Sequence, residues 1–453
     1  MSSVLTPVGS RWRRLGAQLA RGDAPLFALV RSVGTQVFIV LMNLATGIIT
    51  ARLLGAEGRG VYVAITLWPP LLAMLATAGL NSALVFRMRR NPGAPDAVAA
   101  AALLSSFISS AVMIVIGALA MPYFLGGYSP AVVLFAQLCL AAVLVNTTQI
   151  VIKQAFAGTG QYWYCNLTHL LPQLYHLLAL VGIALLATLT ARGAALALFV
   201  SGAIAVLSVL PKFLRSMRPR LLEWRRAAVR AELGEINSYS LRAAPAGLVT
   251  ALILHSDRLV LIPLLTAREL GFYAVAFSFS RVVQFVQPAL QSIFLSHLSG
   301  QREADSLRVH DTACRFLVAA LSAGCVFLWL TGEWLLGFAY GAEFTAAVGI
   351  FRLLIVEASL GVLAQVTVQL YMARDRPGLV SAIQAGTLVV SLVLLLVLVP
   401  RYGGPGAAVA LLCAGAVRWL ALLAGMRFAL KLPLPRPYLN GEDWRYLRSR
   451  LRS

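Results

Sequence analysis

Long apolar runs separated by short polar connections follow one another along almost the whole chain. Each run has about 20 residues or more, which is the length that an α-helix needs to cross a bilayer. None resembles the short alternating segments that are typical of strands in a membrane barrel. The pattern therefore predicts an all-α polytopic membrane protein with about twelve transmembrane helices. The expected spans are residues 28–53, 61–87, 98–122, 131–156, 162–188, 193–214, 239–265, 271–297, 312–337, 346–372, 378–400 and 405–430.

One polar turn occurs twice. The turn Arg52–Tyr62 separates the first two apolar runs, and residues 263–273 separate the seventh and eighth. Leu53, Leu54, Ala56, Gly60 and Tyr62 recur as Leu264, Leu265, Ala267, Gly271 and Tyr273, at a constant spacing of 211 positions. A hairpin repeated at half-length is typical of transporters built from internal repeats. We therefore expect two pseudo-symmetric six-helix lobes, residues 28–214 and 239–430.

Composition agrees with a membrane protein, because 59% of the residues are hydrophobic and only 12% are charged, against about 25% charged in soluble domains. The net charge of +21 lies in the tails and the connections. This distribution indicates the cytoplasmic bias of Lys and Arg and contact with anionic membrane lipids, not nucleic-acid binding.

The distribution of Lys and Arg also predicts the orientation. Alternate connections hold 25 Lys and Arg, whereas the others hold only Arg52, Arg59, Arg192, Arg268 and Arg401. We expect the richer side to be cytoplasmic and both termini to lie there. The N-terminal arm (1–27), the central linker (215–238) and the tail (431–453) are basic and amphipathic, as in segments that lie on a membrane surface.

Charged side chains inside spans are costly and usually face a cavity or a partner. The cationic candidates for a substrate-binding cavity are Arg281, Arg352, Arg418 and Arg31, and its polar wall would include Gln284, Gln291 and Gln365. Guanidinium groups match phosphate oxygens, so this cavity would bind an anionic group. Asp257 and Glu357 could take part in ion coupling. In the alternative interpretation, the arginines pair with these acids and with Glu333 and hold helices together.

No enzyme signature is present. The chain lacks a phosphate-binding loop of the G-x-x-x-x-G-K-[ST] type, an H-E-x-x-H motif and a plausible Ser/His/Asp order. The five cysteines are scattered without metal-ligand spacing, and His169 and His176 lack further ligands. We expect no catalytic residue, no metal and no cofactor.

Two segments resemble a known family. They are Ala51–Tyr62 followed by Ala78-Gly-Leu-Asn-Ser-Ala83, and Asp257–Leu265 followed by Gly271-Phe-Tyr273. Both resemble the hairpins that open the lobes of polysaccharide-biosynthesis flippases, the O-antigen and exopolysaccharide repeat-unit flippases of the multidrug/oligosaccharidyl-lipid/polysaccharide (MOP) superfamily. The resemblance implies transport of undecaprenyl-pyrophosphate-linked oligosaccharide across the bacterial cytoplasmic membrane by alternating access. Among the candidate arginines, Arg281 is the residue that the resemblance favours most for binding the pyrophosphate. A polysaccharide polymerase and glycosyltransferases would be partners.

Two other functions remain open at this stage. A cation-coupled multidrug exporter of the same superfamily would need acids in a cavity, and the first span contains no Asp or Glu. A scaffold of a polysaccharide assembly complex would transport nothing and would need no cavity. The repeated turn, with Arg52, Glu57 and Arg59, resembles a site, but the Lys and Arg distribution places it in an outer loop. It is interpreted as a marker of the repeat.

Overall fold

The computed structural model describes residues 25–91, 93–217, 226–286 and 303–433, with side chains from residue 34 onward except 226–228, 285–286 and 303–313. Every regular element in these ranges is helical. The elements are α2 (Pro25–Thr66), α3 (Trp68–Ala76), α4 (Leu80–Arg90), α5 (Pro95–Phe124), α6 (Pro130–Leu138), η1 (Cys139–Ala141), α7 (Ala142–Gly158), α8 (Tyr162–Leu186), α9 (Ala191–Met217), α10 (Arg226–Leu264), α11 (Ala267–Ser280), η3 (Arg281–Val286), α13 (Glu303–Tyr340), η4 (Ala342–Ala347), α14 (Val348–Ala373) and α15 (Pro377–Phe428).

Nine segments of the described residues are long and apolar enough to cross a membrane. An all-helical polytopic membrane fold is therefore confirmed, whereas the predicted count of twelve spans is not. Part of the difference has a simple cause. Both α2 and α15 contain one residue with non-helical backbone angles, Gly55 (φ 66°) and Gly403 (φ 57°). A positive φ is favourable only for glycine, so each break needs a single glycine where the sequence pattern predicts a loop of several residues.

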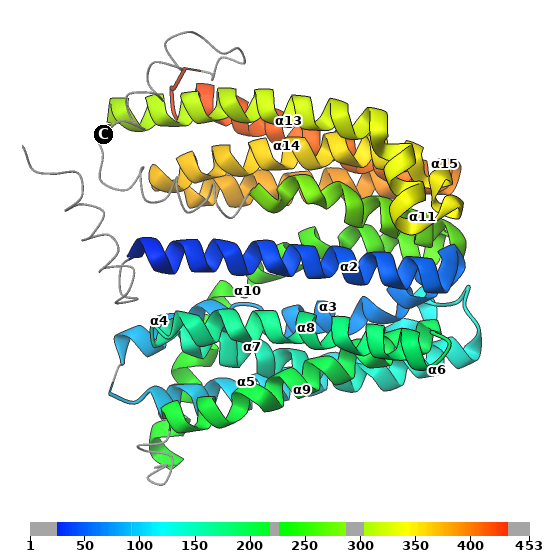
Figure 1. Ribbon diagram of the computed structural model, residues 1–453. Helices are drawn as coiled ribbons and strands as arrows, with labels where there is room; N and C mark the ends of the chain where they lie inside the picture. The colour runs from blue at the N-terminus through cyan, green and yellow to red at the C-terminus, as the bar shows by residue number, and fades with distance from the viewer. Residues whose placement is uncertain (1–24, 92, 218–225, 287–302, 434–453) are drawn as a thin grey trace, which may run out of the picture.

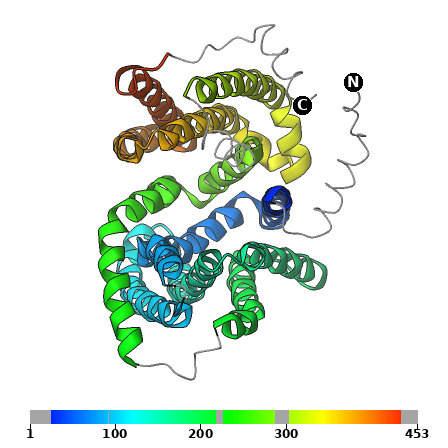
Figure 2. The ribbon, with the colours of Figure 1, turned by 90° about the vertical axis from the view of Figure 1, so that its left-hand side faces the viewer.

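The helices form two bundles (Figures 1 and 2). Helices α4–α9 lie together in one bundle and α11, α13, α14 and α15 in the other, while α2 runs between them and is broken at Gly55, at one end of the molecule. This end is called the Gly55 end below. The largest apolar core contains residues of both bundles, including Tyr62, Trp68, Tyr273 and Phe351.

The two copies of the repeated turn pack against each other at the Gly55 end. Helices α2 and α11 make the most extensive contact of any helix pair. A Cβ atom added to Gly60 would lie 1.7 Å from the carbonyl oxygen of Ala267, and one added to Gly271 would lie 1.9 Å from that of Ala56. These two contacts are equivalent under the sequence repeat. Small residues four positions apart on each helix, Ala56/Gly60 and Ala267/Gly271, let the two backbones touch, as in small-xxx-small crossings of membrane helices.

Polar contacts between the two halves surround this crossing. The Ala56 backbone N–H donates to a carboxylate oxygen of Glu343 (3.1 Å), and Arg268 forms an ion pair with the same carboxylate (3.3 Å). Arg52 donates to the backbone carbonyl groups of Phe338 and Ala339 at the end of α13. An anion at a helix start and a cation at a helix end both complement the helix dipole. Residues of the repeated turn therefore join the two halves at the Gly55 end.

At the opposite end, α10 is joined to α4 by an ion pair. Arg87 donates to both carboxylate oxygens of Glu232 (2.9 and 3.1 Å) and to the more exposed Glu235 (3.3 Å). These hydrogen bonds hold the start of α10 against α4. Helix α10 runs unbroken from Arg226 to Leu264 across the predicted boundary at residue 239, so its start packs on the first half of the chain.

We expect Arg87→Ala to destabilise the protein in detergent by about 3 kcal/mol, because it leaves the buried Glu232 carboxylate without its cation. The matched control is Glu235→Gln, since the Glu235 side chain is 64% exposed and its ion pair should contribute less than about 1 kcal/mol. Thermal unfolding in the same detergent measures both. Equal midpoints for the two variants would contradict the structural role of the Arg87–Glu232 pair.

Candidate functional site

Two cavities lie next to each other in the described part of the protein. Cavity A has a volume of about 370 Å³, and its wall comes from α2, α3, α8 and α9 on one side and from α10 and α11 on the other. Its polar lining consists of Asn43, Thr46, Arg59, Tyr62, Thr66, Gln173, His176, His255, Arg258 and Ser278. No Asp or Glu is among the residues that line it. Cavity A is therefore shared between the halves and is cationic.

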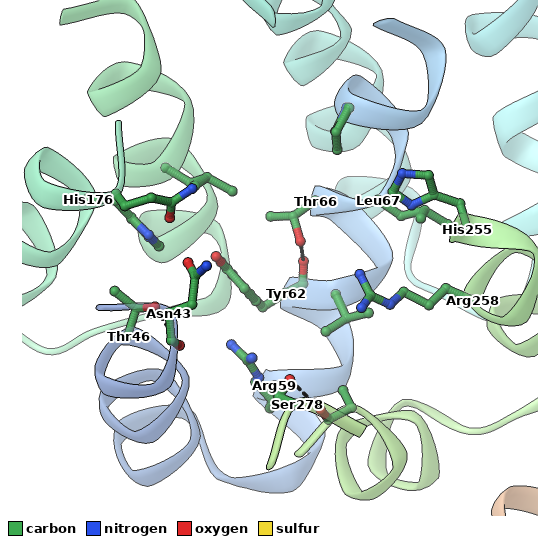
Figure 3. A pocket seen from close by; sticks show the side chains of 15 residues that line it. Asn43, Thr46, Arg59, Tyr62, Thr66, Leu67, His176, His255, Arg258 and Ser278 are labelled. Atoms are coloured by element: carbon green, nitrogen blue, oxygen red, sulfur yellow. Dashed lines mark hydrogen bonds between the residues drawn. The ribbon is translucent and has the colours of Figure 1, made fainter. Parts of the chain in front are cut away.

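Helical spacing brings these side chains to one place. Arg59, Tyr62 and Thr66 lie three and four positions apart on the part of α2 that follows Gly55, so they share one face. His255 and Arg258 are three positions apart on α10. Figure 3 shows Arg59 and Arg258 entering the cavity from these two helices. The reversal at Gly55 thus directs Arg59 into cavity A at the level of the crossing with α11, between Ala56 and Gly60.

Arg59 is buried without a carboxylate partner. It is 8% exposed, it donates to the Thr50 hydroxyl (2.5 Å), and its guanidinium carbon lies 5.1 Å from the centre of the Tyr62 ring. Its Nε–H has no hydrogen-bond partner among the described residues, and the same is true of His176 Nε2. Burying an unpaired charge is costly. An anion in cavity A would offset the charge of Arg59.

Arg258 supplies the second cation of cavity A. Its guanidinium carbon lies 5.1 Å from the centre of the Phe277 ring, and it makes no ion pair with a described residue. The neighbouring Asp257 forms no ion pair with it, and that carboxylate accepts a hydrogen bond from the buried Tyr273 hydroxyl (2.9 Å). Two guanidinium groups from opposite halves can thus approach one ligand, and guanidinium forks bind phosphate oxygens in pairs.

Cavity B, with a volume of about 690 Å³, lies within the second half of the chain and shares His255 and Arg258 with cavity A. Its wall comes from α10, α11, η3, α14 and α15. Six of the residues predicted from the sequence line it: Asp257, Arg281, Gln284, Glu357, Gln365 and Arg418. These six residues come from separate helices and line one cavity, which lies within the second half and not between the predicted lobes.

Pairing with Glu357 accounts for much of the charge in cavity B. Arg281 forms an ion pair with Glu357 (2.9 Å) and lies 4.2 Å from the centre of the Phe277 ring. Arg418 is attracted electrostatically by the same carboxylate but forms no ion pair with a described residue. Both interpretations of Arg281 therefore hold at once, since it lines a cavity and pairs with an acid. Its charge is less available to a ligand than that of Arg59.

Three predicted candidates are not placed in either cavity. Arg352 lies outside both linings, where it donates to the Trp329 carbonyl (3.2 Å) and lies over the Trp329 ring. Gln291 lies outside the described residues, and Arg31 belongs to a part of α2 whose side chains are not described. Their proposed roles stay predictions.

Arg59 was not predicted as a site residue. It follows the predicted end of the first span, so it was assigned to an outer loop. Also not predicted were Gln384, Thr387 and Ser391, which line cavity B from α15. These three recur at spacings of three and four within a long apolar helix. That polar stripe could have identified them. Among the described residues, no group of three His, Cys, Asp or Glu side chains could hold a metal ion, so no metal role is assigned to the cavities.

Comparisons with known proteins found a family model and solved structures that match this chain. Residues 49–349 match the family model described as "Polysaccharide biosynthesis protein". Among solved structures, the lipid II flippase MurJ in an inward closed conformation superposes with a TM-score of 0.72 at 12% identity, over 89% of this chain and 88% of that one. An inward-facing MATE-family multidrug resistance transporter gives 0.68 at 15% identity, over 88% and 98%. A MOP-superfamily transporter from Pyrococcus furiosus gives 0.54 at 17% identity, over 92% and 98%. Among curated proteins, none matches the chain.

Proposed function

Because the chain belongs to the polysaccharide biosynthesis protein family and has the fold of MOP-superfamily transporters, we propose that it moves an undecaprenyl-pyrophosphate-linked oligosaccharide across the bacterial cytoplasmic membrane. Family and fold make it a membrane transporter and not an enzyme. The identity of the substrate is the part of the proposal that goes beyond family and fold, and the lining of cavity A supports it.

The observation that carries the proposal is a cavity between the two halves with two arginines and no acid in its lining. A pyrophosphate carries several negative charges and is the natural partner of two guanidinium groups. A cationic drug would instead be repelled by Arg59 and Arg258. The acids of cavity B already have partners, Tyr273 for Asp257 and Arg281 for Glu357. The lining thus favours a phosphorylated lipid over a cationic drug as substrate.

The proposed transport cycle follows from the contact at the Gly55 end. There the halves touch through Ala56, Gly60, Ala267 and Gly271, while cavity A lies deeper between them. We assign the Gly55 end to the outer side, because the Lys-rich and Arg-rich connections belong to the other side. Separation of the crossing would open cavity A outward, and its closure would return the cavity to the cytoplasmic side. Both termini are then cytoplasmic.

The proposed membrane topology keeps twelve spans in two lobes, residues 28–214 and 239–430. The breaks at Gly55 and Gly403 each divide one long segment into two spans. Helix α11 and η3 belong to the proposed span 271–297 as far as the structure describes it. The start of α10, packed on α4 and α5, then connects the lobes at the cytoplasmic side.

Deletion of the gene in its bacterium should abolish the cell-surface polymer and cause its lipid-linked repeat unit to accumulate on the cytoplasmic side. Complementation with the intact chain should restore the polymer. The measurements are polymer immunoblotting and extraction of the lipid-linked saccharide from the membrane. Normal polymer with no accumulated lipid-linked unit would overturn the proposed function.

A further inference from the structure

Cavity B offers a ligand a different environment from cavity A. Its volume of about 690 Å³ lies within the range of about 300–1,000 Å³ that is usual for small-molecule sites. The two cavities meet at His255 and Arg258, which line both. The two cavities therefore adjoin at these side chains of α10.

The wall of cavity B is rich in side-chain amides that have no hydrogen-bond partner in the part of the chain that the structure describes. Gln284, Gln365 and Gln384 line it, and none makes a hydrogen bond with another described residue. A glutamine amide offers both donors and an acceptor. Sugar hydroxyl groups also donate and accept, so three free amides around one space suit a ligand with many hydroxyl groups.

Apolar and charged groups of the same wall restrict that ligand further. Leu388, Leu411 and Phe277 provide the apolar surface on which the faces of sugar rings can pack. The charges partly cancel, because cavity B, unlike cavity A, has two acids, Asp257 and Glu357, in its lining, and Glu357 is paired with Arg281. An isolated phosphate would find cavity A more favourable, whereas an uncharged polar group suits cavity B.

We infer that cavity B is the binding site for the sugars of the substrate, with uncharged hexose or N-acetylhexosamine units held by the free amides. This inference rests on the proposed function. The pyrophosphate then lies in cavity A between Arg59 and Arg258, and the glycan enters cavity B past His255. The second half of the chain thereby selects the glycan, and the interface between the halves binds the part that all such lipids share.

Thiol protection tests the two cavities separately. The experiment uses a purified variant in which all five cysteines are replaced by alanine, namely Cys139, Cys165, Cys314, Cys325 and Cys413. Ser278→Cys then reports on cavity A and Gly361→Cys on cavity B, through the rate of modification by a small methanethiosulfonate reagent. The probes are undecaprenyl pyrophosphate and an undecaprenyl-pyrophosphate-linked oligosaccharide of uncharged sugars.

We expect both probes to protect Ser278→Cys and only the glycan-bearing probe to protect Gly361→Cys. Protection in cavity A without protection in cavity B by the glycan-bearing probe would overturn the glycan site and leave the proposed function standing. Protection of neither cysteine would overturn the proposed function, and the glycan site with it.

Removing two of the amides should weaken the contact with the glycan alone. In the double variant Gln365→Leu/Gln384→Leu, protection of Gly361→Cys should need about tenfold more glycan-bearing probe, as expected for two lost hydrogen bonds. Protection of Ser278→Cys by undecaprenyl pyrophosphate should be unchanged. Gln137→Leu, whose amide bonds to the Ala118 carbonyl away from both cavities, is the matched control. An unchanged requirement for the glycan-bearing probe in the double variant would overturn the assignment of the amides.

Discussion

Replacement of Gly271 with valine is expected to abolish polymer export while the protein still inserts into the membrane. The new Cβ atom would lie 1.9 Å from the Ala56 carbonyl oxygen, which belongs to a backbone that cannot move aside alone. Helices α2 and α11 would have to separate, and the Gly55 end could not close. Complementation of the deletion strain measures the effect, and we expect a loss of at least about a hundredfold, since blocking a required state removes the whole transport cycle.

The sequence repeat makes the same prediction for the other copy of the turn. A Cβ atom on Gly60 would lie 1.7 Å from the Ala267 carbonyl oxygen, so Gly60→Val should have an equal effect. Gly349→Val is the matched control, because α14 leaves open space around this glycine. Its polymer level should match that of the unmodified chain.

Thiol labelling distinguishes a crossing that cannot close from a protein that fails to fold. In a separated state, a membrane-impermeant thiol reagent added from the Gly55 side should reach Ser278→Cys in cavity A. The same reagent should reach it more slowly in the unmodified chain, whose crossing is closed for part of the transport cycle. Normal polymer export by Gly271→Val, or no gain in labelling despite correct insertion, would contradict a gate at this crossing.

The fold could be predicted to a large extent because the membrane imposes simple rules. Apolar runs of bilayer length must be helices, since no water is present to bond the backbone. The hydropathy pattern fails to predict where individual helices begin, break and end. One glycine suffices to reverse a helix at Gly55 or Gly403, whereas hydropathy averages over many residues and therefore shows a wider loop. Helix α10 likewise begins before its apolar part, because Arg87 on α4 stabilises its charged start through Glu232.

The site was predictable in part for a related reason. A charge inside an apolar run indicates a cavity or a partner, and Arg281 and Glu357 both line cavity B, but the sequence cannot show that the two side chains bind each other. Arg59 was missed because counting Lys and Arg in loops assumes that residues near a turn face water. The helix resumes at once after Gly55, so four positions are enough to bury Arg59. The backbone angles at Gly55 determine whether Arg59 lies in an exposed loop or on a buried helix.

Arg59→Met is expected to reduce transport by about tenfold to a hundredfold, because it removes a charged hydrogen bond to phosphate worth about 1.5–3 kcal/mol. Methionine keeps the apolar length of the side chain. The cost to the fold should be small, since the Thr50 hydroxyl still has the Thr46 carbonyl as its partner (2.6 Å). Polymer export in the complemented strain measures transport, and thermal unfolding of the purified variant measures the fold.

Two further variants distinguish charge recognition from packing at this position. Arg59→Lys keeps the charge but not the planar fork, so its transport should lie between those of Arg59→Met and the unmodified chain. Arg192→Met removes an exposed arginine at the start of α9, outside both cavities, and should leave transport unchanged. The concentration of undecaprenyl pyrophosphate that protects Ser278→Cys should rise in the order Arg, Lys, Met at position 59. Equal protection by all three would mean that the pyrophosphate binds elsewhere, since a guanidinium lost from its binding site must weaken the contact with the phosphate oxygens.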